Sequence, residues 1–348
     1  MTFIELEDVE KVFSVRRKTG LLRREKREVR AVDGISFGVD RGEMVGYIGP
    51  NGAGKSTTIK MLTGILTPSG GRLRVAGIDP SPSSRLRSSR GGPNRERTRL
   101  AQRIGVVFGQ RTTLWWDLPL RDSYRLMHRM YRIPDARYAE NLARCVDLLE
   151  LGDLLEVPVR QLSLGQRMRG DIAAALLHDP DVLYLDEPTI GLDVVSKARV
   201  REFLRELNTS RGTTVLLTTH DLTDIEQLCS RVMVIDHGRL MYDGDLTGLH
   251  EAGSEGESER LLVVDLEREL PPIEVPGARF VRAEGPRQWL AFPSSSSAAP
   301  LVAAVAERYP LVDLSVREPD IEAVIAKMYG ERAERGGQRE LRVRPESH

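Results

Sequence analysis

The stretch that decides the fold is Gly49-Pro50-Asn51-Gly52-Ala53-Gly54-Lys55-Ser56-Thr57, which matches the P-loop pattern G-x-x-x-x-G-K-[ST] at every fixed position. Apolar residues 44–48 precede it and predict a buried strand, and a helix-compatible run, 57–62, follows. In this order the loop N–H groups and the helix N-terminus form a cradle for anions. Lys55 is expected to reach the β- and γ-phosphates of a nucleotide, and Ser56 to help hold Mg²⁺. The alternative is a glycine-rich turn that merely connects a strand to a helix.

Composition and charge describe an ordinary globular chain. Its 348 residues are 40% hydrophobic and 29% charged, and the length suggests two or three domains. A formal net charge of +0 and an aromatic content of 5% argue against a surface for nucleic acid, so no such partner is expected. Cys145 and Cys229 lack disulfide or metal spacing, which favours a reducing cytosol. Neither a signal peptide nor a membrane-spanning run is visible, so at a membrane another chain would have to cross it.

Charged residues interrupt the N-terminal part of the chain. Residues 4–13 alternate weakly between apolar and polar side chains, which predicts an edge strand or a hairpin. Residues 15–32 form a strongly basic insertion, for which a solvated loop is favoured over contact with anionic lipid head groups or a membrane partner. Residues 80–99 are rich in Ser, Arg, Gly and Pro, and predict a mobile surface loop.

A second group of motifs begins at Leu162-Ser163-Leu164-Gly165-Gln166. Ser163 and Gln166 have the S-x-x-Q spacing of a capping box, which predicts the start of a helix. The apolar run 182–185 predicts a strand that leads directly into Asp186-Glu187-Pro188, and Asp193 is placed to cap a further helix. Strands that alternate with helices in this way predict a parallel, largely buried sheet.

Polar residues end several of the predicted strands. Gln110, Asp186 and His220 each follow an apolar run, and ligands of parallel sheets bind beyond the carboxyl ends of the strands. Asp186 is expected as a second Mg²⁺ ligand beside Ser56, and Glu187 is placed to polarise the water that attacks a γ-phosphate. Taken alone, His220 is expected to be a packed or surface histidine. Its place among the other strand ends favours a catalytic role instead.

Together these motifs resemble the nucleotide-binding subunit of an ATP-binding cassette (ABC) transporter, in the family's order and over about residues 1–247. The resemblance implies that residues 49–57 are Walker A, 162–166 the signature motif, 182–187 Walker B and 191–193 the D-loop. Gln110 matches the Q-loop glutamine, and His220 matches the switch histidine. The signature motif separates this family from P-loop GTPases and helicases. Phe13 lies about where the adenine-stacking aromatic falls, although the basic insertion places it further from the P-loop than usual.

The resemblance therefore implies a full set of site residues for ATP and Mg²⁺. The expected catalytic residues are Glu187 and His220, and the expected Mg²⁺ ligands are Ser56, Gln110 and Asp186. The expected nucleotide contacts are Phe13, Gly49, Pro50, Asn51, Gly52, Ala53, Gly54, Lys55, Ser56, Thr57, Gln110, Ser163, Gly165, Gln166 and Asp193.

One residue departs from the family pattern. Leu164 stands in the signature motif where the family usually has glycine, while Ser163 and Gly165 are retained. By resemblance, these two residues and the helix behind them bind the γ-phosphate of ATP held by the opposite subunit. Because Leu164 adds bulk close to that phosphate, we expect it to alter the geometry or affinity of the dimer without abolishing function.

The resemblance also implies an architecture. The fold class is an α/β P-loop NTPase of ABC type, with a mainly parallel central sheet, an antiparallel edge subdomain and a helical subdomain at about residues 111–180. The expected domains are the ATPase at 1–247, a linker at 248–260, a small α+β domain at 261–330 and a charged, disordered tail at 331–348. Residues 312–322 resemble the C-terminal extension of drug- and antibiotic-export ATPases, which favours export over import.

The expected function is that of an ATP-hydrolysing subunit on the cytoplasmic face of the cell membrane. Two ATPase subunits, identical or paralogous, would close around two ATP molecules and drive a separate transmembrane permease. Trp115 and Trp116 are expected either to form a groove for a helix of that permease or to be simply buried. The alternative is a soluble ABC-type ATPase acting on a ribosome or nucleic acid. Such translation factors normally carry two cassettes, and DNA-repair relatives carry coiled coils or zinc modules that this sequence lacks.

Overall fold

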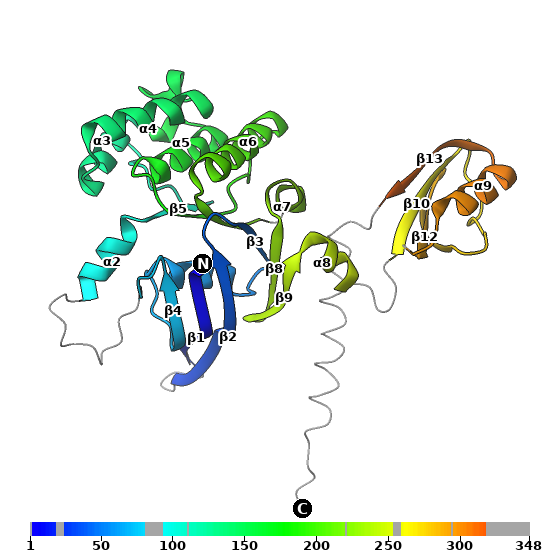
Figure 1. Cartoon of the computed structure of the whole chain (residues 1–348), viewed down its shortest axis with the longest axis horizontal. Helices are drawn as coiled ribbons and strands as arrows, with labels where there is room; N and C mark the ends of the chain where they lie inside the picture. The colour runs from blue at the N-terminus through cyan, green and yellow to red at the C-terminus, as the bar shows by residue number, and fades with distance from the viewer. Residues whose placement is uncertain are drawn as a thin grey trace, which may run out of the picture. The chain divides into compact units, whose positions relative to one another are not determined.

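The computed structural model describes residues 2–18, 24–80, 93–109, 111–219, 221–252, 259–293 and 295–317. The chain divides into two compact units, Met1–Gly244 and Asp245–His348 (Figure 1). Helix α8 (Leu246–Ala252), with Leu249 fully buried, occupies the start of the segment expected to be a linker. Among the described residues, no helix is both long and apolar enough to cross a membrane.

A six-stranded sheet forms the centre of the first unit, in the order β5-β6-β7-β3-β8-β9. Its strands are β3 (Met44–Ile48), β5 (Ile104–Phe108), β6 (Val182–Asp186), β7 (Thr214–Thr218), β8 (Arg231–Asp236) and β9 (Arg239–Asp245). The pairs from β5 through β6, β7 and β3 to β8 are all parallel. Every residue of β3 and β7 is buried, because parallel strands are covered on both faces. The predicted mainly parallel sheet is confirmed.

Helices surround this sheet, and those of the helical subdomain gather at one end of the unit (Figure 1). In the described part of the first unit, the α-helices are α1 (Lys55–Leu62), α2 (Pro93–Ala101), α3 (Leu120–Tyr131), α4 (Asp135–Leu148), α5 (Leu164–Leu176), α6 (Val194–Arg211) and α7 (Leu222–Leu228). Helices α3 and α4 lie within the helical subdomain expected at about residues 111–180. Arg132 adopts a left-handed conformation and Pro134 precedes α4, so the chain turns there between α3 and α4. Part of the loop expected over 80–99 is helix α2, while residues 81–92 lie outside the described chain.

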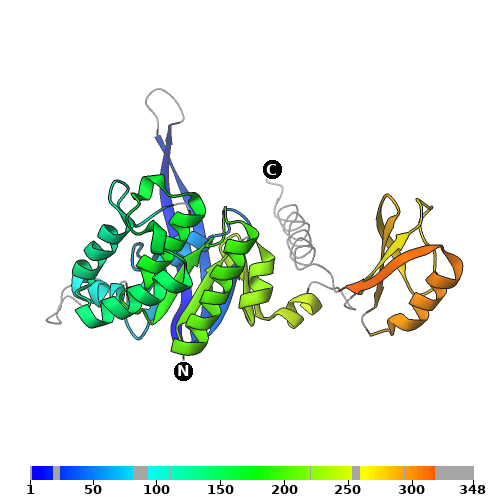
Figure 2. The same cartoon turned by 90° about the horizontal axis from the view of Figure 1, so that it is seen from above.

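A three-stranded antiparallel sheet, β2-β1-β4, corresponds to the predicted edge subdomain. It contains β1 (Thr2–Lys18), β2 (Arg24–Asp40) and β4 (Gly70–Val75). For residues 4–13 the hairpin alternative is confirmed, because β1 pairs antiparallel with β2, the next strand of the chain; the edge-strand alternative is wrong, because β1 is the central strand. The solvated loop expected for the basic insertion is also wrong, since most of the insertion continues the β1–β2 ladder. Backbone pairing runs as far as Lys18 and Arg24, whereas β4 pairs with β1 only as far as Glu10. Figure 2 shows the two long strands extending beyond the rest of the unit.

The core of the first unit joins this antiparallel sheet to the central one. Ile4 and Ile35 of the antiparallel sheet pack in one buried cluster with Tyr47 of β3 and Ile59 of α1. The strand that leads into the P-loop stretch and the helix that leaves it are therefore both held by the main core.

The second unit is a small α+β arrangement, as expected. Its antiparallel sheet has the order β11-β12-β10-β13, and helix α9 (Ala298–Arg308) packs with it. The strands are β10 (Glu259–Leu266), β11 (Arg279–Glu284), β12 (Arg287–Pro293) and β13 (Leu311–Arg317). Leu262, Leu290 and Phe292 share a separate core with Leu301 and Val305 of α9. The final helix and charged tail expected after residue 318 lie outside the described residues.

Candidate functional site

The loop between β3 and α1 depends on glycine for steric reasons. At Gly49 an added Cβ atom would lie 2.3 Å from the carbonyl oxygen of Ile235, and at Gly54 it would lie 2.4 Å from that of Ala31. Gly54 also has φ +110, a conformation that other residues rarely adopt. Two glycines of the motif are therefore required by the close approach of neighbouring backbone.

Lys55 is the first residue of α1, and its side chain turns back over the loop. The residue is buried, and Nζ donates hydrogen bonds to the carbonyl oxygens of Gly49 at 2.5 Å and Pro50 at 3.1 Å. Desolvation lowers the pKa of Lys55, and the nearby charges of Glu187 and Asp186 oppose that shift. A cation is thus fixed inside the loop, close to two carboxylates.

Ser56 and Asp186 come together from separate elements. The Ser56 hydroxyl donates to Asp186 Oδ2 at 3.2 Å, and the hydroxyl of Thr218, at the end of β7, donates to Asp186 Oδ1 at 2.5 Å. A serine hydroxyl beside a carboxylate is an oxygen donor set of the kind that Mg²⁺ prefers. In the described part of the chain, no group of three or more His, Cys, Asp or Glu side chains could hold a metal. Gln110, the third expected ligand, lies outside the described residues, and phosphate oxygens and water are further ligands that Mg²⁺ commonly takes at such sites.

Glu187 follows directly in an unusual backbone conformation. Its φ is +58, and its N–H donates to the carbonyl oxygen of Thr218 at 2.9 Å. Gly109, just beyond β5, lies so close that an added Cβ atom would be 2.9 Å from the Cβ atom of Glu187. Left-handed backbone at a non-glycine residue costs free energy and occurs frequently at functional sites. The surrounding strands therefore hold Glu187 in one orientation.

A cavity of about 500 Å³ joins these groups. Its lining includes Asn51 and Lys55 of the loop region, Ile65, and the two carboxylate residues Asp186 and Glu187. Gln110 and His220 lie outside the described residues, although Gly109 and Arg111 on either side of Gln110 both line the cavity.

Phe13, the residue expected to stack on adenine, lies on the long strand β1. It lies on β1 opposite Val29, half-buried, with the ammonium of Lys11 5.2 Å from its ring centroid. The cavity lining in the described chain includes Ala31 of β2 but not Phe13. Stacking of Phe13 on adenine stays a prediction.

The signature stretch forms the N-terminus of α5 and does not line the cavity that contains Lys55. Ser163 Oγ accepts from the N–H of Gln166 at 3.1 Å, and Gln166 Oε1 accepts from the N–H of Ser163 at 2.9 Å. The predicted capping box is present. Asp193 caps α6 by accepting from the N–H and the hydroxyl of Ser196. The side-chain hydrogen bond from Ser196 lowers the pKa of Asp193.

Two residues that hold parts of the site in place, Thr218 and Asp171, were not predicted from the sequence. Thr218 contacts both Asp186 and Glu187, and its position at the end of a β-branched run was the only signal for it. Asp171 of α5 is buried, and its Oδ1 atom accepts from the N–H of Thr113 at 2.8 Å and from the hydroxyls of Thr112 and Thr113 at 3.0 Å. Burial raises the pKa of Asp171 against the effect of these donors. The segment after Gln110 is thereby attached to the helix that carries the signature stretch.

Comparison with known proteins identifies a matching family and relatives that are similar in sequence. Residues 32–190 match the family described as ABC transporter. The chain is 39% identical over 273 residues to the daunorubicin/doxorubicin resistance ATP-binding protein DrrA of Streptomyces peucetius, covering 74% of this chain and 78% of that protein. It is 38% identical over 235 residues to the Nod factor export ATP-binding protein I of Ralstonia nicotianae, covering 67% and 68% of the two chains.

A solved structure agrees with these relatives. The dimeric structure of MJ0796, a bacterial ABC transporter cassette, superposes with a TM-score of 0.58 at 25% sequence identity. The match covers 70% of this chain and 98% of that cassette.

Proposed function

The chain belongs to the ATP-binding subunits of ABC transporters, a family that hydrolyses ATP to ADP and phosphate in a reaction coupled to transport, and we propose how its residues carry out that activity. Two ATPase subunits, either two copies or one copy and a paralogue, close around two ATP molecules. Their closing and opening drives export through a separate transmembrane permease. The subunit works at the cytoplasmic face of the membrane.

The observation that carries this proposal is the meeting of Lys55, Ser56, Asp186 and Glu187 at one cavity. Lys55 and the loop N–H groups bind the phosphates of ATP. Ser56 and Asp186 would hold Mg²⁺, which when bound neutralises phosphate charge. Glu187, fixed through its backbone to Thr218, orients the attacking water, and His220 is proposed to contact the γ-phosphate.

The position of α5 supports a shared site. Ser163 and Gly165 lie away from the cavity of their own chain, at a helix N-terminus that favours anions. Apolar side chains near this end are exposed to solvent, including Leu164, Val194 and Val195. In the proposed dimer, Ser163 and Gly165 cover the ATP bound to the partner's P-loop, together with Gln166 and Asp193. Closure excludes water and supplies donors to the phosphates, and hydrolysis removes the group that held the two subunits together.

The permease contact is proposed at Trp115 and Trp116. Their exposed fractions are 37% and 51%, so neither is fully buried. The N–H of Trp115 donates to the Ser123 hydroxyl at 3.3 Å, and the Arg167 guanidinium lies 5.4 Å from the Trp116 ring centroid. The Trp115 backbone is thus attached to α3 and the Trp116 ring lies beside α5, and a short permease helix can pack on the exposed parts of both side chains. Export is favoured because one relative is named for Nod factor export and another for drug resistance.

The test is a Glu187→Gln substitution in the full chain. The variant is expected to bind Mg²⁺-ATP with unchanged affinity, to lose at least about a hundredfold in hydrolysis rate, and to accumulate as a dimer, because water is no longer activated. Size-exclusion chromatography with light scattering measures the dimer, and phosphate release measures the rate. Glu202→Gln is the matched control, since Glu202 is an exposed glutamate on α6. Parental hydrolysis by Glu187→Gln would remove the proposed role of that residue.

A second measurement separates the transport proposal from the soluble alternative. Cell extract is divided into membranes and ribosomes, and the tagged chain is recovered from each with its partners. Co-purification with a polytopic membrane protein is the expected result. Recovery with ribosomes alone would favour the alternative.

A further inference from the structure

The segment 187–193, which joins β6 to α6, contacts the N-terminus of α5 through two reciprocal packings. An added Cβ atom on Gly191 would lie 2.3 Å from Leu164 Cδ2 and 3.2 Å from Leu164 Cγ. An added Cβ atom on Gly165 would lie 2.9 Å from Leu192 Cδ2. Each leucine therefore occupies the space that a glycine of the other segment leaves free. We call these two packings the paired leucine–glycine contact.

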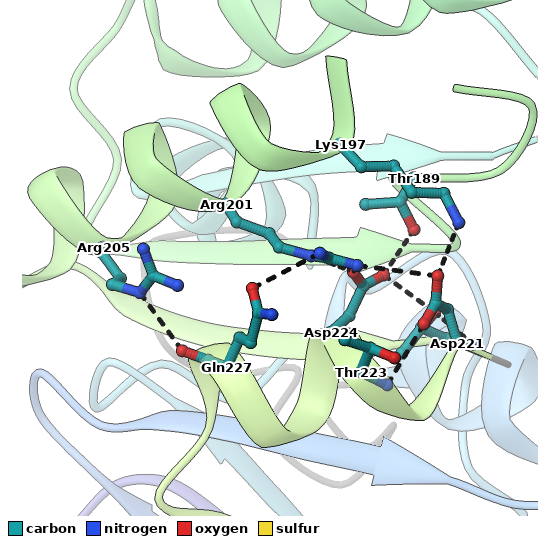
Figure 3. Close-up of polar contacts among 9 residues, drawn as sticks. Thr189, Lys197, Arg201, Arg205, Asp221, Thr223, Asp224 and Gln227 are labelled. Atoms are coloured by element: carbon teal, nitrogen blue, oxygen red, sulfur yellow. Dashed lines mark hydrogen bonds and ion pairs between the residues drawn. The ribbon is translucent and has the colours of Figure 1, made fainter. Parts of the chain in front are cut away.

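The same segment is fixed on its other side by buried charge. The hydroxyl of Thr189 donates to Asp224 Oδ2 at 2.5 Å, and Asp224 is fully buried on α7. Arg201 of α6 forms an ion pair with Asp224 at 2.5 Å, and Lys197 of α6 donates to Asp221 at 2.6 Å. Figure 3 shows these side chains converging between α6 and α7. Thr189 is consequently held against the body of the unit.

Contacts with β7, α7 and α5 restrict independent movement of segment 187–193. Glu187 is tied to β7 through Thr218, Thr189 to α7, and Gly191 and Leu192 to α5. Leu192 is buried and Leu164 is partly exposed, and each lies so close to its glycine partner that little free volume is left, so that displacement of one segment displaces the other. Movement of the N-terminus of α5 is therefore passed to the backbone that carries Glu187.

We infer that Leu164 is a positioning residue that makes the N-terminus of α5 and the segment carrying Glu187 move as one body. This inference rests on the proposed function, in which Ser163 faces the ATP of the partner subunit and Glu187 faces the ATP of its own chain. The paired leucine–glycine contact then connects the two ATP sites of one dimer. Leu164, with 40% of its surface exposed, sets this connection and is not among the described residues that line the cavity of its own chain.

The first test is the dependence of ATPase rate on Mg²⁺-ATP concentration in the full chain. Wild-type protein is expected to respond cooperatively. Leu164→Ala is expected to lower the Hill coefficient towards 1 and the turnover number severalfold, with the affinity of the monomeric P-loop for Mg²⁺-ATP unchanged. Leu164→Met keeps an adaptable apolar side chain over Gly191 and is expected to restore cooperativity. A wild-type Hill coefficient of 1, or one that Leu164→Ala leaves unchanged, overturns the inference.

A double-mutant cycle provides the second test. In Gly191→Ala the new Cβ atom would collide with Leu164, and φ of +69 adds backbone strain. If the contact matters, Leu164→Ala partly restores the turnover and cooperativity that Gly191→Ala loses. Gly212→Ala is the matched control, because Gly212 has φ of +63 and an added Cβ atom there would meet nothing within 4 Å. Losses that simply add in the double variant, or an equal loss in Gly212→Ala, contradict the inference.

Different results would overturn the proposed function and the role of Leu164. If wild-type protein neither hydrolyses ATP nor yields a dimer as Glu187→Gln, the proposed function fails. If both occur while cooperativity is insensitive to position 164, only the role of Leu164 fails.

Discussion

At the scale of single residues, uncharged residues help to determine the geometry of the cavity. Gly109 allows β5 to approach Glu187, and Thr218 supplies a hydroxyl to Asp186 and a carbonyl oxygen to the Glu187 N–H. Thr218 is fully buried, so its hydroxyl orients the carboxylate from the side opposite Ser56. Residues that orient a metal ligand generally matter nearly as much as the ligand.

Replacement of Thr218 by valine is therefore expected to raise the Mg²⁺ concentration needed for half-maximal ATPase activity by about ten- to hundredfold. The shape is nearly preserved, but Asp186 loses one donor. Titration of Mg²⁺ at saturating ATP measures the effect. Thr214→Val at the other end of β7 is the control, because Thr214 is equally buried but accepts from the Gly42 N–H. An unchanged Mg²⁺ requirement in Thr218→Val would show that Asp186 needs no such support.

Local rules predicted some of these residues and not others. The P-loop motif and the capping box are short-range patterns, so Lys55 and Ser163 could be placed from the sequence. Thr218 and the packing of Leu164 on Gly191 depend on contacts between distant segments, which no local spacing encodes.

At the scale of elements, α5 connects the parts of the site. Its N-terminus carries the capping box, and Asp171, two turns further along, holds the segment of Thr112 and Thr113. Helices α6 and α7 are joined in a similar way by Arg201 and Asp224. The fully buried Asp224 is paired, and burial of an unpaired charge would be costly.

Asp224→Ala is expected to lower the free energy of unfolding by about 3 kcal/mol, since the buried Arg201 guanidinium would lose its carboxylate at 2.5 Å and keep only the more distant Asp221, at 3.6 Å. Urea denaturation followed by circular dichroism measures the loss. Arg205→Ala is the control, because Arg205 is exposed and its guanidinium donates to a carbonyl oxygen, that of Gln227, rather than to a buried carboxylate (Figure 3). Its expected cost is below about 1 kcal/mol. Equal losses in the two variants would argue against a special role for the buried pair.

Differences between the expected and the observed structure also occur at the level of helices and strands. The basic insertion was expected to be a loop because charge runs favour solvent, yet charged residues can extend an antiparallel ladder whose backbone groups pair with each other. The helical subdomain could be expected from the resemblance, but apolar periodicity does not mark where a left-handed residue such as Arg132 separates α3 from α4.

At the scale of the whole molecule, the chain has two units with separate cores. The larger core includes Tyr47 and Ile59, and the smaller one includes Leu290 and Phe292. Both cysteines of the sequence, Cys145 and Cys229, belong to the larger unit and are buried. The reactivity of their thiols can therefore be used to measure unfolding of the larger unit.

Burial raises the pKa of both thiols to about 12. At pH 8 only about one thiol in ten thousand would then be thiolate in the folded unit, against about one in four at the ordinary value. Alkylation by iodoacetamide at pH 8 is expected to be negligible in native protein and rapid in urea, with the native rate rising as pH increases. Mass spectrometry of the labelled chain measures it. Fast native labelling would contradict this burial.

The paired leucine–glycine contact also limits which sequences the chain can tolerate. Positions 164 and 191 share one volume, and positions 165 and 192 share another, so each pair accepts one large and one small residue. In a library that randomises all four positions, selection for ATPase activity should return substitutions that are linked within each pair. The residues tolerated at positions 164 and 165 of the signature stretch therefore depend on the residues at positions 191 and 192, more than twenty residues further along the chain.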